Sequence, residues 1–184
     1  MSQEKQLQED YGSVKRAKKF YDKQQIHHLN DMMIQFISNQ EIMFIATSDK
    51  DGNCDSSIRV GKKGFISVIN ERTLLYPEYR GNGVFASLGN IVENPHIGIL
   101  LVDFSNSTIG LHINGQAEIV DDPEGVNDPL AERWVCVSVE EAYIHCSKHI
   151  PRLKKMDKKI HWNTDDHKLK GGNYFEVKNP EPQR

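Results

Sequence analysis

The chain has 184 residues, of which 38% are hydrophobic and 27% are charged, and its formal net charge is −3. This length suits one domain with terminal extensions, and the weak negative charge gives no overall attraction to nucleic acid or to an anionic membrane surface, so neither is expected as a partner. No apolar run approaches the ~20 residues of a membrane-spanning helix, and the polar residues 1–10 lack the apolar core of a signal peptide.

The first predicted element is a long helix over residues 14–37. Apolar residues between Ala17 and Ile37 recur at spacings of three and four, which gives the helix one apolar stripe. Lysines and arginines near its start lie mostly off this stripe and are typical of a solvated helix face. The preceding residues 1–13 are polar, and we expect them to be flexible, disordered or loosely attached.

From residue 41 the pattern changes to that of β-strands. A buried strand at 42–47 is followed by Asp51-Gly52, a strong hairpin signal, and by a return strand at 54–60. Asn114-Gly115 indicates a bulge inside a long later strand. Further strands are predicted at 65–69, 73–76, 97–104, 109–120, 134–139 and 142–146. Six or seven short strands joined by hairpins, with few helices, predict a closed or nearly closed antiparallel barrel.

Short helices are predicted outside the strands. One opens at about Val84 and stops before Pro95, because a proline disfavours helical backbone at the residue preceding it. Asp121 and Pro123 indicate another helix start. The remainder, 147–184, is a basic and polar tail.

The three cysteines, Cys54, Cys136 and Cys146, are odd in number and irregularly spaced. This pattern argues against a disulfide scaffold, and reduced thiols are typical of a cytoplasmic protein. His145 and His149 lie close to Cys146, and imidazole together with thiolate suits zinc. Because no second cluster supplies the remaining ligands at a convincing spacing, we expect no metal site.

The glycine-rich loop at residues 80–83 carries the clearest chemical signal. It leads into the helix at Val84, and a helix start presents unpaired backbone N–H groups and a positive dipole end that can hold a phosphate. Arg80 in this loop and Arg59 at the end of a strand add guanidinium groups, which suit phosphate oxygens. We therefore predict a phosphate site in this stretch.

Several short motifs fall in a fixed order along the chain: Arg59-Val60-Gly61, Tyr76-Pro77, Arg80-Gly81-Asn82-Gly83, and residues 90–98, 113–117 and 143–146. Together they resemble the pyridoxamine 5′-phosphate oxidase-like split-barrel flavoproteins, over roughly residues 36–152.

The resemblance implies an FMN-binding split β-barrel. Together with the patterns above, it predicts a mainly β (α+β) fold: an antiparallel split β-barrel of six to seven strands with a long N-terminal helix and short peripheral helices. The predicted parts are a flexible N-terminus at 1–13, an FMN-binding split-barrel domain at 14–152 that includes the N-terminal helix, and a C-terminal extension at 153–184. The resemblance also implies a homodimer that holds flavin mononucleotide (FMN) at the subunit interface and acts on a small-molecule substrate.

The resemblance also assigns cofactor contacts. Arg59 matches the family's phosphate-binding arginine, and Tyr76 with Pro77 matches the strand end that lines the flavin. No catalytic side chain is identified, because the flavin itself carries the redox chemistry. The expected FMN-binding residues are Arg59, Val60, Gly61, Tyr76, Pro77, Arg80, Gly81, Asn82, Ser87 and Asn90.

The sequence departs from the pyridoxamine phosphate oxidases proper. Ala86-Ser87 stands near the position of their Arg-Lys pair, and their C-terminal arginine-and-histidine element has no counterpart here. We therefore expect an FMN-dependent oxidoreductase that moves hydride or electrons between a reduced nicotinamide or similar donor and another small molecule. The alternative is a non-catalytic flavin- or heme-binding protein for storage, sensing or delivery, with His112 or His145 as the axial ligand of a heme.

Overall fold

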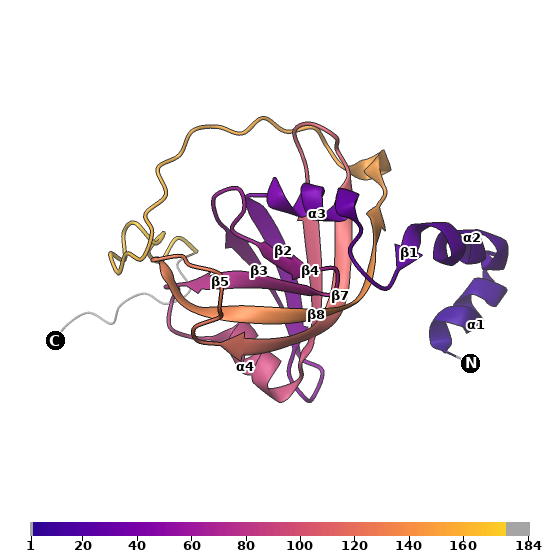
Figure 1. Ribbon diagram of the computed structural model, residues 1–184, viewed down its shortest axis with the longest axis horizontal. Helices are drawn as coiled ribbons and strands as arrows, with labels where there is room; N and C mark the ends of the chain where they lie inside the picture. The colour runs from indigo at the N-terminus through magenta and orange to yellow at the C-terminus, as the bar shows by residue number, and fades with distance from the viewer. Residues whose placement is uncertain (1, 176–184) are drawn as a thin grey trace.

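The computed structural model describes residues 2–175, which are built around an antiparallel sheet (Figure 1). Its strands run in the order β3-β2-β6-β7-β8-β5-β4, and β1 pairs with β8. The strands are Gln25–Ile26 (β1), Ile42–Ser48 (β2), Cys54–Val60 (β3), Ser67–Asn70 (β4), Thr73–Tyr79 (β5), His96–Val102 (β6), Gly110–Val120 (β7) and Ala131–His145 (β8). The helices are Gln3–Asp10 (α1), Val14–Gln24 (α2), Asp31–Ser38 (α3), Ala86–Glu93 (α4) and a 3₁₀ turn, Ser147–His149 (η1).

Strand β8 joins the two halves of the sheet. Its residues 134–138 pair with β5 on one side and with β7 on the other. Figure 1 shows β5 and β8 running across β2 and β7, so that the sheet curls around one core and leaves β3 and β4 as its edges. This arrangement confirms the mainly β split barrel. The strands within residues 2–175 number eight rather than six or seven, because the two-residue β1 is too short to show a sequence period.

The core lies inside the curled sheet, where α3 and α4 contribute to it. In β2 and β6 every second residue is buried, as expected for strands with one face on the core. Helix α4 adds the buried side chains of Leu88 and Ile91. The largest fully buried residues are Leu29, Ile37, Met43, Ile45, Leu74, Tyr76, Pro77, Ile99, Leu101, Ile113, Val135 and Val137.

The predicted bulge in β7 is confirmed. The register between β7 and β8 shifts between Asn114 and Gly115. A Cβ atom placed on Gly115 would lie 2.0 Å from the backbone oxygen of Ser138. Glycine is therefore needed here because the two strands approach too closely for any side chain.

The predicted long N-terminal helix is wrong, because the chain forms α2, the short strand β1 and then α3. Gln25 and Ile26 pair with Tyr143 and Ala142 of β8, so strand pairing overrides the helical period. Asn30 then starts α3, with its side chain accepting a hydrogen bond from the backbone N–H of Met33 at 2.9 Å. Figure 1 shows α1 and α2 lying to one side of the barrel.

Residues 3–10, expected to be disordered or loosely attached, form the exposed helix α1, whose Gln8 side chain donates a hydrogen bond to the Tyr21 hydroxyl of α2 at 2.7 Å. The helix replaces the disordered alternative, and loose attachment of this segment stays a prediction. Two further expectations need correction. Residues 121–124 do not form a helix. The two strands predicted at 134–139 and 142–146 are one continuous strand, β8. The predicted helix before Pro95 is confirmed as α4.

None of the helices within residues 2–175 combines the length and the apolar character that crossing a membrane requires.

Candidate functional site

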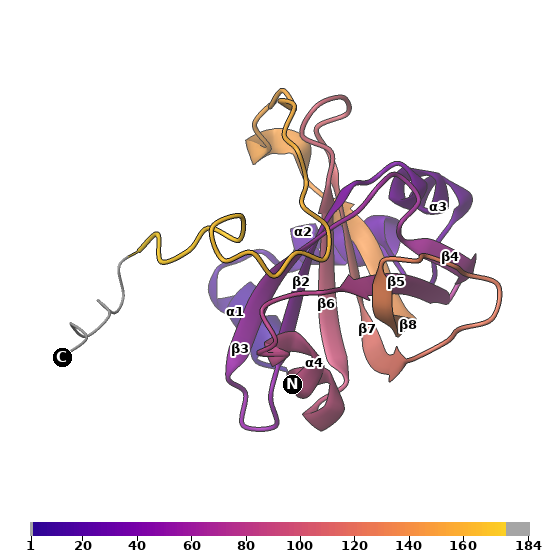
Figure 2. The ribbon, with the colours of Figure 1, turned by 90° about the vertical axis from the view of Figure 1, so that its left-hand side faces the viewer.

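A cavity of about 670 Å³ lies where the predicted phosphate site falls. Its walls come from five parts of the chain: β3 between Asp55 and Val60, the end of β5 with the loop that follows, the first turn of α4, Arg133 of β8, and the C-terminal segment 158–170. Figure 2 shows β3, α4 and this segment on the same side of the molecule. Segments far apart in the sequence thus meet around one space.

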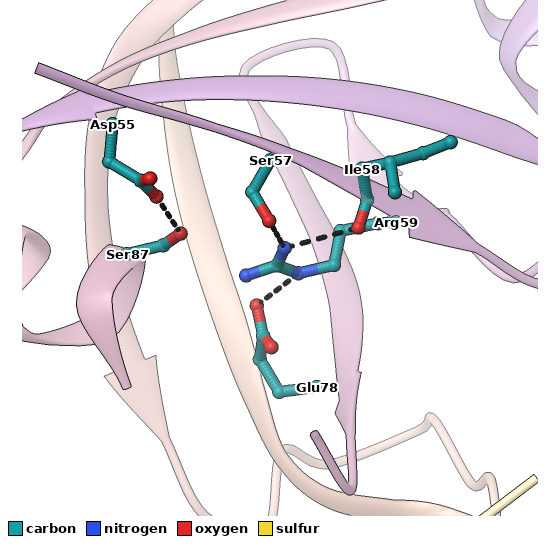
Figure 3. Close-up of polar contacts among 6 residues, drawn as sticks. All are labelled: Asp55, Ser57, Ile58, Arg59, Glu78 and Ser87. Atoms are coloured by element: carbon teal, nitrogen blue, oxygen red, sulfur yellow. Dashed lines mark hydrogen bonds and ion pairs between the residues drawn. The ribbon is translucent and has the colours of Figure 1, made fainter. Parts of the chain in front are cut away.

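Arg59 is held in the cavity wall by Glu78 of β5. Its Nε donates to the Glu78 carboxylate at 2.7 Å, and its Nη1 donates to the Ser57 hydroxyl at 2.7 Å and to the Ile58 carbonyl at 3.2 Å (Figure 3). The side chains of Arg59 and Glu78 are only 16% and 11% exposed. Nη2 makes no hydrogen bond to any residue that the structure describes, so one end of a fixed guanidinium group remains available to a ligand.

Sequence reasoning missed Glu78, although its position offered a signal, because this acid directly follows the apolar run 74–77 at the end of a predicted strand. The structure shows that Glu78 is buried, and buried charges are normally paired. Burial raises the pKa of Glu78 above its ordinary value, and the charge of Arg59 acts in the opposite direction. The pair therefore keeps a cation in the wall without leaving a buried charge unmatched.

The first turn of α4 forms another wall. Phe85 precedes the helix in the left-handed region, with φ of 56°, and Gly83 also has a positive φ, of 81°. The Ser87 hydroxyl donates to the Asp55 carboxylate of β3 at 2.8 Å (Figure 3). This bond ties the helix start to the strand, and the first N–H groups of the helix lie at the same end.

Arg80 is engaged by the C-terminal segment. Its Nη2 lies 2.5 Å from the Asp165 carboxylate, and its backbone N–H donates to the Asn163 side-chain oxygen at 3.3 Å. Trp162 packs edge-on against Tyr79, with 5.1 Å between the ring centroids. Apart from its lysines, which are able to extend the positive field around a phosphate, the C-terminal segment carries no sequence signal for these contacts, because it has no period and the contacts span about 80 residues of chain.

The cavity is positively charged, in contrast to the chain as a whole, which has a formal net charge of −3. Arg133 of β8 lines the cavity, and its guanidinium group lies over the Phe85 ring, 5.0 Å from the ring centroid. The charged lining consists of Arg59, Arg80, Arg133, Lys158, Lys159 and Lys170 against Asp55 and Glu78. Such a surplus of cationic groups around a concave site favours an anionic ligand.

Six of the ten predicted cofactor residues line this cavity: Arg59, Val60, Arg80, Gly81, Asn82 and Ser87. The other four lie elsewhere, and their contact with a cofactor stays a prediction.

These four residues have structural surroundings of their own. Tyr76 and Pro77 are fully buried, and the Tyr76 hydroxyl has no hydrogen-bond partner among the described residues. The Asn90 side chain donates to the Thr47 hydroxyl at 3.1 Å. Gly61 is buried, and a Cβ atom there would lie 2.3 Å from the Phe65 side chain.

Two histidines named as possible heme ligands form a separate cluster on β7 and β8. His112 Nε2 and His145 Nδ1 lie 2.8 Å apart, and the His112 ring stacks on Tyr143 at 4.7 Å between centroids. Neither residue lines the cavity. Across residues 2–175, no three His, Cys, Asp or Glu side chains are grouped so that they could hold a metal ion.

The histidine pair predicts a pH dependence of stability. Burial, and then the nearby His145, lower the pKa of His112 below its ordinary value of 6.5. The unfolded chain therefore binds a proton that folded His112 does not, so this residue makes the free energy of unfolding fall as pH drops below about 6.5. In urea denaturation between about pH 5.5 and pH 8, His112→Gln should show a shallower dependence than the wild type. Equal pH dependence in both proteins would contradict this role.

Comparison with known protein families finds one match. The family model described as pyridoxamine 5′-phosphate oxidase matches residues 29–153, which is more than half of the chain. A search of curated proteins finds no match.

Solved structures share the fold. HupZ of group A Streptococcus is 21% identical and superposes with a TM-score of 0.50 over 63% of this chain and 93% of HupZ. A point variant of HupZ is 20% identical, with a TM-score of 0.50 over 64% of this chain and 99% of that one. At this identity the likeness concerns the fold. Because the family match spans the strands of the curled sheet from β2 to β8, the chain belongs to the pyridoxamine 5′-phosphate oxidase-like split-barrel family.

Proposed function

We propose that this chain binds FMN in the cavity beside β3 and α4 and works as an FMN-dependent oxidoreductase on a small molecule. The observation that carries this proposal is the cationic lining of a cavity at a helix start, in a chain that is acidic overall. A phosphate monoester carries roughly −1.5 to −2 charges at pH 7 and has three strong acceptor oxygens. The donors around the cavity match that demand.

Arg59 is the best-prepared phosphate ligand. Its guanidinium is fixed by Glu78 and Ser57, and Nη2 has no partner among the described residues. A donor that is already held in position loses little conformational freedom when a ligand binds. Arg80 and the first backbone N–H groups of α4 would complete the phosphate site.

The rest of the cavity suits a flat aromatic group. Val60, Val84, Phe85, Leu88 and Trp162 give it apolar wall, and its volume of about 670 Å³ lies within the range typical of small-molecule sites. The residues present therefore fit a ligand with an aromatic body and an anionic end. Bound FMN would supply hydride and electron transfer, while the protein would bind and orient the cofactor and cover part of it with apolar side chains.

A second copy of the chain is the partner in this proposal. Ile58, Val84 and Phe85 are exposed and lie at the cavity. A homodimer with the cavity at its interface would cover these apolar side chains and enclose the cofactor, as the family resemblance implies. The three free cysteines are compatible with the proposed cytoplasmic location.

The purified protein provides the test. We expect a flavin absorption spectrum, bleaching of that spectrum on anaerobic mixing with NADH or NADPH, and a sedimenting mass near twice 21.1 kDa. A protein that keeps its flavin but is bleached by neither donor would support the non-catalytic alternative. A colourless protein that fails to take up added FMN would contradict flavin binding altogether, and a monomer would contradict the interface site.

A further inference from the structure

The C-terminal segment 158–170, hereafter the strap, is attached to the loop that is proposed to hold the FMN phosphate. The Asp165 carboxylate pairs with Arg80, the Asn163 side chain accepts from the backbone N–H of Arg80, and Lys170 Nζ donates to the Gly81 carbonyl at 3.1 Å. Trp162 rests on Tyr79 at the end of β5. All four contacts lie within residues 79–81, so the strap holds one short stretch of the cavity wall.

The ion pair between Arg80 and Asp165 is exposed enough for another anion to replace the carboxylate. The Arg80 and Asp165 side chains are 50% and 63% exposed, and ion pairs in solvent contribute little to stability. The strap contains neither a helix nor a strand, and none of its residues is fully buried. A stronger anion that reaches Arg80 can therefore replace the carboxylate without disturbing the core.

We propose that Asp165 is an internal competitor for the phosphate site: its carboxylate occupies Arg80, and the phosphate of FMN displaces it. This inference deepens the proposed function and rests on it. A phosphate presents more charge than a carboxylate and can use the α4 N–H groups as well. Displacement removes one of the four contacts between the strap and the 79–81 stretch, so that FMN binding and loosening of the strap are coupled.

Asp165→Asn tests this competition directly, because it removes the charge and keeps the shape. FMN titrations followed by flavin fluorescence at low ionic strength should give about 1.5- to 5-fold tighter binding than in the wild type, the range expected for an exposed ion pair. Asp157→Asn is the matched control, since it makes the same charge change in the same tail at a carboxylate that pairs with none of the described residues, whereas Asp165 pairs with Arg80. Its affinity should equal that of the wild type.

A double-mutant cycle separates competition from a general charge effect. In an Arg80→Gln background, Asp165→Asn should leave FMN affinity unchanged, because the group it competes for is gone. Equal or weaker FMN binding by Asp165→Asn in the wild-type background, or the same gain with Arg80 absent, would overturn the proposal while FMN binding stands. No FMN binding by any variant would instead overturn the proposed function, and the competition with it.

Trypsin cleavage after the strap lysines gives a second readout that does not use flavin. Inorganic phosphate should speed cleavage of the strap in the wild type, and Asp165→Asn should be cleaved fast without phosphate. A strap that is cut at the same rate in both proteins, with and without phosphate, would contradict its attachment through Asp165.

Discussion

Arg59→Ala is expected to weaken FMN binding by about 1.5–3 kcal/mol, or roughly 10- to 150-fold, because it removes a charge-assisted donor from the phosphate site. Arg59 is the cavity cation that the fold holds most firmly, through Glu78, Ser57 and its own strand. No neighbouring donor can take the place of the Arg59 guanidinium, since Arg80 and the α4 backbone line other parts of the cavity. Equilibrium titration with FMN measures the change.

The same substitution should leave riboflavin affinity nearly unchanged, because riboflavin lacks the phosphate. An equal loss for both ligands would remove Arg59 from the phosphate site. Arg72→Ala is the matched control, as Arg72 is exposed in the turn between β4 and β5 and does not line the cavity.

Glu78 must be considered when Arg59 is removed, because it loses its ion-pair partner. Arg59 now opposes the rise in the pKa of Glu78 that burial causes, so its removal raises that pKa further. Such an acid takes up a proton rather than remain charged without a partner. Arg59→Ala/Glu78→Gln carries no such acid and should show the same loss of FMN affinity. Glu78→Gln alone should bind FMN at least as tightly as the wild type, since it removes a negative charge from the cavity.

Gly115→Ala is expected to lower the free energy of unfolding by about 3 kcal/mol, at the upper end of the cost of overpacking. The new Cβ atom would meet the Ser138 backbone oxygen, and backbone in paired strands cannot move aside as a flexible side chain can. The clash falls where β7 meets β8, the strand that connects both halves of the barrel. Urea denaturation of the cofactor-free protein measures the loss.

Gly98→Ala is the control for this prediction. Gly98 lies on the neighbouring strand β6, and a Cβ atom there would be 3.4 Å from the Asn114 side chain and 3.9 Å from Ala46, both ordinary contacts. We expect a change below about 1 kcal/mol. Similar stability losses at both glycines would contradict a specific clash at the bulge.

The sequence predicted the barrel well where local pattern and tertiary structure agree. Apolar runs predicted β2 and β6, the Asp51-Gly52 turn predicted the hairpin that leads into β3, and Asn114-Gly115 predicted the bulge. It failed at residues 25–30, where pairing of β1 with β8 interrupts an apolar stripe that continues into α3. A helical period cannot reveal a strand that exists only because a distant strand offers it partners.

The candidate site was predictable in part. Arg59, Arg80 and the start of α4 were marked by residue type and spacing, and all line one cavity. Their existing partners were not predictable, because Glu78 and Asp165 reach them from 19 and 85 positions along the chain. Sequence alone suggested two free guanidinium groups, whereas the structure pairs each with a carboxylate. An anion that binds in this cavity must therefore either contact an arginine that stays paired with its carboxylate or displace that carboxylate.

The most direct test of a phosphate site in this cavity is the ratio of FMN to riboflavin affinity, measured by equilibrium titration of the cofactor-free protein. We expect FMN to bind at least about tenfold more tightly, since even one charge-assisted contact to the phosphate contributes about 1.5–3 kcal/mol. Equal affinities, or tighter binding of riboflavin, would contradict the assignment of the cationic cavity to the phosphate of FMN.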